Sequence, residues 1–325
     1  MKKASPANRL LWIDNLRGFS IFFVILLHVS ITVEGNNGVV FSIFNQINTV
    51  LTPFRLGLMF FVSGLFFSNG INKGVSIFIK RKVKAILYPF LIWSLIYSLA
   101  FILAKRLWMI PSAYGFYAIN HLSGGGDITW FLHSLFVFFI ISIFTHKVSV
   151  YIVVPVCWVL YFLIPEIPEN SFFSSFDNGH FNKSLLLFIF FHLGCVFSEK
   201  KSEAEKLCNR KSVIIISALF SLVISIVSVN QKCLANLFSF SAIPFFMFLA
   251  NTKAFYVFNY FGSRSISFYL SHYLILLTAN KMLLIFFVFP LGLKYALLFS
   301  ITLIGAFLVT YGRRIRLVNK LFVMS

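Results

Sequence analysis

The chain has 325 residues, of which 59% are hydrophobic and 11% are charged, and its mean hydropathy is +0.89. A soluble globular protein carries roughly 25% charged residues, so this composition excludes soluble two-domain enzymes, disordered regulators and secreted disulfide-rich peptides. The formal net charge is +19, yet no basic domain stands apart from the apolar runs. Nucleic acid is therefore not expected as a partner, and the charge has to be explained by membrane topology.

Long apolar segments follow one another along the chain. A helix that crosses the hydrocarbon core of a bilayer needs about 20 mostly apolar residues. The sequence predicts an all-α polytopic bundle of about ten transmembrane helices, within a single integral membrane domain over residues 1–325. The predicted spans are 16–33, 50–67, 85–104, 128–145, 148–164, 184–197, 213–229, 233–250, 266–279 and 293–311. Spans 184–197 and 266–279 are short, and the apolar stretch 282–289 is a candidate interfacial or re-entrant piece.

Lysine and arginine residues predict the orientation of these spans. With the N-terminus inside, 21 of the 28 basic residues fall on the inner side and 7 on the outer side. Cytoplasmic loops of membrane proteins carry such an excess of positive charge. Both termini are therefore predicted to be cytoplasmic, in a multi-pass membrane protein with membrane lipids around it.

The first span holds two ionisable residues on one face. Arg17 and His28 are eleven positions apart, which is close to three helical turns and about 16 Å along the axis. Arg17 alone would suit a membrane anchor and His28 alone a structural hydrogen bond. Ionisable groups inside a membrane are functional candidates by default, however, and the shared face favours a common role. Asp14 is too far from His28 to orient its ring and is expected to pair with Arg17 or Arg9.

Further polar residues occur at later spans. Arg55 lies where the second span enters from the outside, and Ser63 precedes a glycine suited to close helix packing. The basic cluster at 80–84 suits either lipid headgroups or the phosphates of a nucleotide-bearing cofactor. His272 is a second intramembrane histidine, which we expect to line the same polar cavity as His28.

The four cysteines predict neither a metal site nor a disulfide framework. They are scattered, with no pair at ligand spacing and no nearby histidine pattern, at Cys157, Cys195, Cys208 and Cys233. No metal is therefore expected.

Several motifs together resemble the acyltransferase-3 family, which comprises integral membrane enzymes that move acetyl or other acyl groups from coenzyme A to sugars of surface glycans. The first of them is similar to the family's pattern of arginine, ten residues and histidine. The motifs are Trp12-Ile13-Asp14-Asn15-Leu16-Arg17-Gly18 through His28, Phe60-Phe61-Val62-Ser63-Gly64, Trp130-Phe131-Leu132 and Ser265-Ile266-Ser267-Phe268-Tyr269-Leu270-Ser271-His272.

This resemblance implies an acyl-CoA-dependent O-acyltransferase, in the simplest case an O-acetyltransferase that uses acetyl-CoA. The acceptor would be a hydroxyl of a cell-surface polysaccharide or of a lipid-linked glycan. Arg17 would hold the donor, and His28 would act in transfer as a general base or as a covalent acyl carrier. The family often has paired arginines in the first cytoplasmic loop, and Arg81 and Lys84 are the nearest equivalents here. The remaining residues expected at the substrate cavity are Asp14, Arg55, Ser63, Trp130 and His272.

Other functions compete with this interpretation. A transporter or flippase for a lipid-linked glycan would also have a basic inner rim and buried polar groups, but transporters often contain inverted repeats, and no repeat is visible. A membrane acyltransferase of another class, acting on lipid or protein hydroxyls, is the alternative among enzymes. A purely structural subunit leaves the shared face of Arg17 and His28 unexplained.

Overall fold

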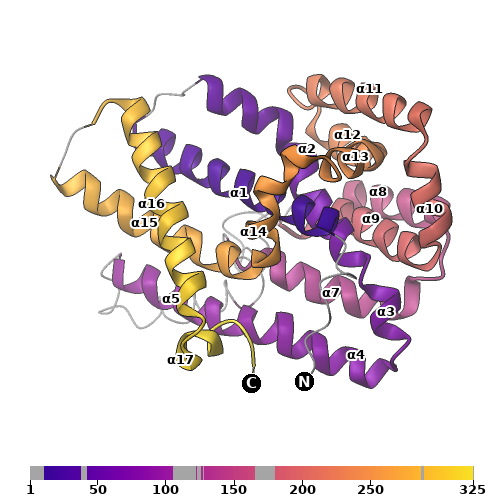
Figure 1. Cartoon of the computed structure of the whole chain (residues 1–325), viewed down its shortest axis with the longest axis horizontal. Helices are drawn as coiled ribbons and strands as arrows, with labels where there is room; N and C mark the ends of the chain where they lie inside the picture. Colours follow the sequence, from indigo (N-terminus) through magenta and orange to yellow (C-terminus); the bar gives the residue numbers. More distant parts are fainter. Residues whose placement is uncertain are drawn as a thin grey trace.

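The computed structural model describes residues 11–37, 42–104, 122, 126, 128–164, 180–286 and 289–324. Within these ranges the chain is helical and contains no strand (Figure 1). Three sets of residues used in the sequence argument lie outside them: the N-terminal segment 1–10, the outer segments 105–121 and 165–179, and residues 287–288.

Helices of very different length make up the described chain (Figure 1). Those of 14 residues or more are α1 (Leu11–Asn37), α2 (Ser42–Gly64), α5 (Tyr88–Ala104), α7 (Trp130–Thr145), α8 (Val150–Leu163), α9 (His180–Glu199), α11 (Lys211–Val227), α15 (Ser265–Phe286) and α16 (Leu291–Gly312). The shorter elements are α3 (Phe67–Ile71), α4 (Val75–Lys82), the π-helix η2 (Val83–Leu87), α10 (Lys201–Cys208), α12 (Lys232–Phe238), η5 (Ser239–Ala242), α13 (Ile243–Ala250), η6 (Lys253–Phe258), α14 (Asn259–Ser263) and α17 (Arg316–Lys320).

Each of the ten predicted spans coincides with a helix or a continuous run of helices. Among the residues that the structure describes, five stretches have the length and apolar composition to cross a membrane, and a sixth results if α10 and α11, bent by 73°, count as one. The five are Leu11–Gly35, Ile43–Ile71, Val75–Ala104, Lys232–Ala250 and Leu291–Gly312. The protein is thus an integral membrane protein, and the total of ten spans stays a prediction.

The ninth predicted span is longer than the apolar pattern indicated. Helix α15 has 22 residues and continues through residues 282–286, which the sequence had marked as the start of a separate interfacial piece. The polar residues between the two apolar stretches are compatible with a helix. The helix therefore continues where the hydrophobicity is interrupted.

Two glycine crossings bring the central helices into close contact. A Cβ atom on Gly18 of α1 would overlap the carbonyl oxygen of Phe258, and one on Gly262 of α14 would overlap that of Asp14. The same relation holds between Gly64 of α2 and Gly194 of α9. Small residues let helix backbones approach closely in membrane proteins. The first crossing holds the start of α1 against the segment that precedes α15.

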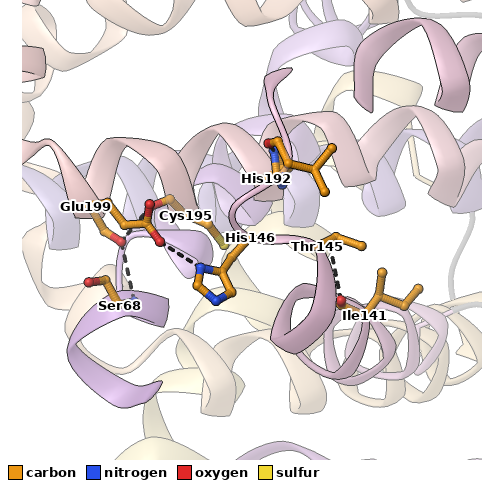
Figure 2. Close-up of polar contacts among 9 residues, drawn as sticks. Ser68, Ile141, Thr145, His146, His192, Cys195 and Glu199 are labelled. Carbon is orange, nitrogen blue, oxygen red and sulfur yellow. Dashed lines mark hydrogen bonds and ion pairs between the residues drawn. The ribbon is translucent and has the colours of Figure 1, made fainter. Parts of the chain in front are cut away.

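A polar cluster ties α3, α7 and α9 together at one end (Figure 2). His146 Nδ1 and Glu199 Oε1 are 2.8 Å apart, and the backbone N–H of Ser68 donates to Ser198 Oγ at 3.4 Å. A ring nitrogen of His192 contacts the carbonyl oxygen of Val148 at 2.9 Å. These contacts join α9 to α3 and to the segment that follows α7.

Candidate active site

A cavity of about 370 Å³ lies among α1, α2, α4, η2, α7, α14 and α15, a volume within the range of small-molecule sites. Four cationic side chains and one carboxylate line it, namely Arg17, Lys82, Arg264, Arg313 and Asp14. The four cations come from segments that the charge distribution assigns to the cytoplasmic side. Such an excess of positive charge suits an anionic ligand that arrives from the cytoplasm.

The π-helical turn η2 shapes one wall of the cavity. It follows α4 directly, and Lys82, Ala85 and Ile86 from this junction all line the cavity. π-helical turns of this kind are often found at functional sites.

Lys82 itself is held among aromatic rings. Its Nζ lies 3.4 Å from the ring centroid of Phe139 and 5.2 Å from that of Phe78. In the described part of the chain, no carboxylate lies within ion-pair distance of this ammonium group. The rings stabilise the charge in part, and a bound phosphate would stabilise it further.

The arginines are positioned by aromatic rings and short polar contacts. Arg17 lies over the ring of Phe66, with 4.8 Å between the guanidinium carbon and the ring centroid. Arg313 donates to Ser267 Oγ at 2.8 Å. Burial lowers the pKa of Arg313, and the positive charge of Arg264 lowers it further. Two cations held close enough to repel each other favour a shared anion.

The structure brings some predicted residues into this cavity and leaves others out. Asp14, Arg17 and Ser63 line it, whereas the side chains of Arg81 and Lys84 are exposed and do not. Lys82 takes their place because Phe78, Lys82 and Ile86 share one helical stripe, at i, i+4 and i+8, and both of its apolar members are buried. This apolar spacing around Lys82 was the available signal in the sequence.

Arg264, Arg313 and Tyr269 also line the cavity without having been singled out. In the sequence, Arg264 and Arg313 contribute only to the distribution of basic residues across the membrane. They are adjacent because α15 and α16 pack against each other, a relation that no local pattern encodes.

His28 of α1 and His272 of α15 form a pair. His272 Nε2 lies 3.3 Å from His28 Nδ1, and the two ring centroids are 5.1 Å apart. His272 is fully buried. The expected neighbourhood of the two histidines is thus present, but neither of them lines the 370 Å³ cavity.

The neighbours of the pair specify its tautomers. His272 Nδ1 lies 2.7 Å from the carbonyl oxygen of Tyr269 and 3.0 Å from that of Phe268, and His28 Nδ1 lies 2.8 Å from that of Val24. A carbonyl oxygen only accepts, so Nδ1 carries the proton in both neutral rings. His272 Nε2 then accepts from His28 Nδ1. His28 Nε2 keeps its lone pair and has no hydrogen-bond partner among the described residues.

Two further predicted residues lie outside the cationic cavity. Arg55 is buried, donating to Asn48 Oδ1 and Thr52 Oγ1, both at 2.9 Å. Lys183 Nζ lies 5.5 Å from the ring centroid of Trp130. Neither Arg55 nor Trp130 lines the cationic cavity.

An aromatic boundary separates the cavity from the histidine pair. Tyr269 and Phe131 both line the cavity, with ring centroids 5.2 Å apart. The ring of Tyr269 is in turn 6.0 Å from that of His272. Arg17 and His28, predicted to share one face of the first span, are therefore separated by Tyr269.

Within the described ranges, no group of three or more His, Cys, Asp or Glu side chains is placed to hold a metal ion. The four cysteines are free thiols.

The apolar helical bundle, with a cationic cavity next to a histidine pair, is an integral membrane protein with a candidate site for an anionic ligand. The chain belongs to the acyltransferase-3 family, whose model, described as an acyltransferase domain, matches residues 10–311. It is therefore a membrane acyltransferase. No curated protein and no solved structure matches it.

Proposed function

We propose that this membrane acyltransferase is an O-acyltransferase of the bacterial inner membrane. It moves an acyl group, in the simplest case acetyl, from acyl-CoA to a hydroxyl of a cell-surface polysaccharide or lipid-linked glycan. The observation that carries the proposal is the lone pair on His28 Nε2, which has no hydrogen-bond partner among the described residues, in a ring whose other nitrogen is held by Val24 and His272.

The cationic cavity supports binding of the donor's phosphates. Arg17, Lys82 and Arg313 come from three separate helical segments and face one space, with Arg264 beside them. Phosphate groups are the anions that converging guanidinium and ammonium groups bind best. The pantetheine arm would then extend along α1 towards His28, about 16 Å away at about 1.5 Å per residue, with Tyr269 turning aside to admit it.

The transfer step follows from the tautomer of His28. A sugar hydroxyl donates its proton to His28 Nε2 as its oxygen bonds to the thioester carbon, and the C–S bond breaks. The coenzyme A thiolate leaves and takes up the proton. The Nδ1–H of the transient imidazolium stays bonded to the Val24 carbonyl oxygen, which stabilises the positive charge. Covalent acylation of His28 itself is the second route to the same product.

Donor binding and turnover, measured on the same purified variants, test this proposal. We expect His28→Ala to keep its affinity for acetyl-CoA while transfer slows by roughly a hundredfold to ten-thousandfold, the usual range for losing a general base. His133→Ala is the matched control, because His133 is another partly buried histidine, its ring lies against Phe90, and it does not line the cationic cavity.

Equal loss of donor affinity and turnover in His28→Ala would make His28 a binding or packing residue. Mass spectrometry of surface glycans from cells with and without the gene would identify the acceptor.

A further inference from the structure

A second cavity, of about 300 Å³, lies between α5 and α15. Its walls are almost entirely apolar. Ala100 and Ala104, one turn apart on α5, leave the space open on one side, and Leu274 and Leu277 of α15 face it from the other. Tyr97 closes one end and Lys281 lies at the other. We call this space the α5–α15 groove.

The Tyr97 end of the groove is close to the histidine pair. The hydroxyl group of Tyr97 donates to the carbonyl oxygen of Leu270 at 2.7 Å, which holds α5 against α15. The rings of Tyr97 and Tyr273 are 6.3 Å apart, and Tyr273 is 5.2 Å from the ring of His28. One aromatic side chain therefore separates the groove from His28.

Helix α15 places three regions in succession along one axis. Residues 265–269 line the cationic cavity, His272 belongs to the histidine pair, and residues 274–282 line the groove. A donor with its phosphates in the cavity and its thioester at His28 would direct its acyl chain away from the phosphates. That direction leads to the groove.

We propose that the α5–α15 groove binds the hydrocarbon chain of the acyl group that is transferred, so that the enzyme accepts chains longer than acetyl. This inference rests on the proposed use of acyl-CoA. From Leu274 to Lys281 the groove is about 10 Å long at about 1.5 Å per residue. An extended chain advances about 1.2 Å per bond, so the groove has room for a linear chain of about eight carbons.

The hydrophobic effect sets the expected magnitude. Each methylene that leaves water for apolar walls strengthens binding by about fourfold. Acyl-CoA affinity should therefore rise with chain length up to the length of the groove and then level off. We expect octanoyl-CoA to bind the purified protein at least about tenfold more tightly than acetyl-CoA.

Groove-filling variants test the assignment. Ala100→Trp places an indole ring between the two helices and should bring the octanoyl-CoA to acetyl-CoA affinity ratio close to one. Leu99→Trp is the matched control, because Leu99 directly precedes Ala100 on α5, is 56% exposed and does not line the groove; this variant should keep the wild-type ratio. Leu277→Phe narrows the groove from the side of α15 and provides the same test if Ala100→Trp does not fold.

The possible outcomes test the groove assignment and the use of acyl-CoA separately. An affinity ratio near one in the wild-type protein, or an equal change in Ala100→Trp and Leu99→Trp, would overturn the groove assignment and leave acyl-CoA as donor. No binding of any acyl-CoA would overturn the proposed function as well. A preference for octanoyl-CoA that Ala100→Trp and Leu277→Phe both remove would establish the groove as the site that selects the acyl chain.

Discussion

The ammonium group of Lys82 lies in surroundings that a charge does not favour. It is enclosed by aromatic rings, next to other cations of the same cavity. An isolated charge in an apolar environment destabilises the folded state unless a counter-charge binds. The charge of Lys82 therefore lowers the stability of the ligand-free protein and, for the same reason, favours the binding of an anion.

Replacing Lys82 should separate these two effects. We expect Lys82→Met to lose about tenfold to a hundredfold in coenzyme A affinity, because one cation of the cavity is removed. The same variant should unfold at a temperature equal to or above that of the wild type in the absence of ligand, since an unpaired charge is gone. Calorimetric titration and thermal unfolding in detergent measure both quantities.

Lys84→Met is the control for this change, because Lys84 lies two residues further along and is exposed. It should leave affinity within about twofold of the wild type, as is usual for exposed charges. If the two variants lost the same affinity, the phosphates would be bound at the surface of the cluster and not in the cavity.

His272 is a positioning residue for His28. Its Nε2 accepts from His28 Nδ1, so His272→Leu should lower turnover by about tenfold or more while the KM for the donor stays unchanged. His272→Gln offers an amide oxygen in a similar place and should retain more activity than His272→Leu. Steady-state kinetics on the two variants measure the difference, and equal activity in both would mean that the bond to His28 is not used.

At the scale of elements, the crossing of α1 and α14 positions the start of the cavity. Gly262 contacts the backbone of Asp14 and Gly18 contacts that of Phe258, so neither helix can move away without disturbing Arg17. The crossing depends on two residues without side chains, which makes it sensitive to a single methyl group.

The variant Gly262→Ala tests this dependence. Its new Cβ would meet the Asp14 carbonyl oxygen, and overpacking of this kind costs roughly 1–3 kcal/mol. We expect a lower unfolding temperature in detergent and weaker donor binding. Gly292→Ala is the control because nothing lies within 4 Å of its added Cβ; comparable destabilisation in both variants would contradict the role of the crossing.

At the scale of the whole molecule, the cations of the cavity agree with the predicted topology. Arg17, Lys82, Arg264 and Arg313 are far apart in the sequence, were all assigned to the inner side, and line one cavity. Segments on opposite sides of a membrane could not meet in this way. The result supports a common side for four segments and leaves the number of spans open.

Reporter fusions address the number of spans. With ten spans and both termini in the cytoplasm, an enzyme that folds only outside the membrane should be inactive when fused after Ser325 and active when inserted between residues 105 and 121. A cytoplasm-dependent fluorescent reporter at the same two positions should give the opposite pattern. Activity of the external reporter after Ser325 would refute an even number of spans.

Local features of the sequence were sufficient to predict the helices and one face of α1. Apolar length predicts a helix because a backbone in lipid must satisfy its own hydrogen bonds, and each of the ten predicted spans is helical. The separation of Arg17 and His28 depends only on the helical repeat. The motifs around these two residues also carried the family resemblance.

The tertiary structure decided which side chains meet. His28 and His272 are 244 positions apart, and their contact depends on how α1 packs against α15. Lys82 enters the cavity, whereas Arg81 and Lys84 do not, because α4 and the π-helical turn present one face of the basic cluster to α7. Phe78 and Ile86 indicate in the sequence which face of the basic cluster turns inward, but the helices packed against that face decide that it lines a cavity, because no local pattern encodes which helices meet.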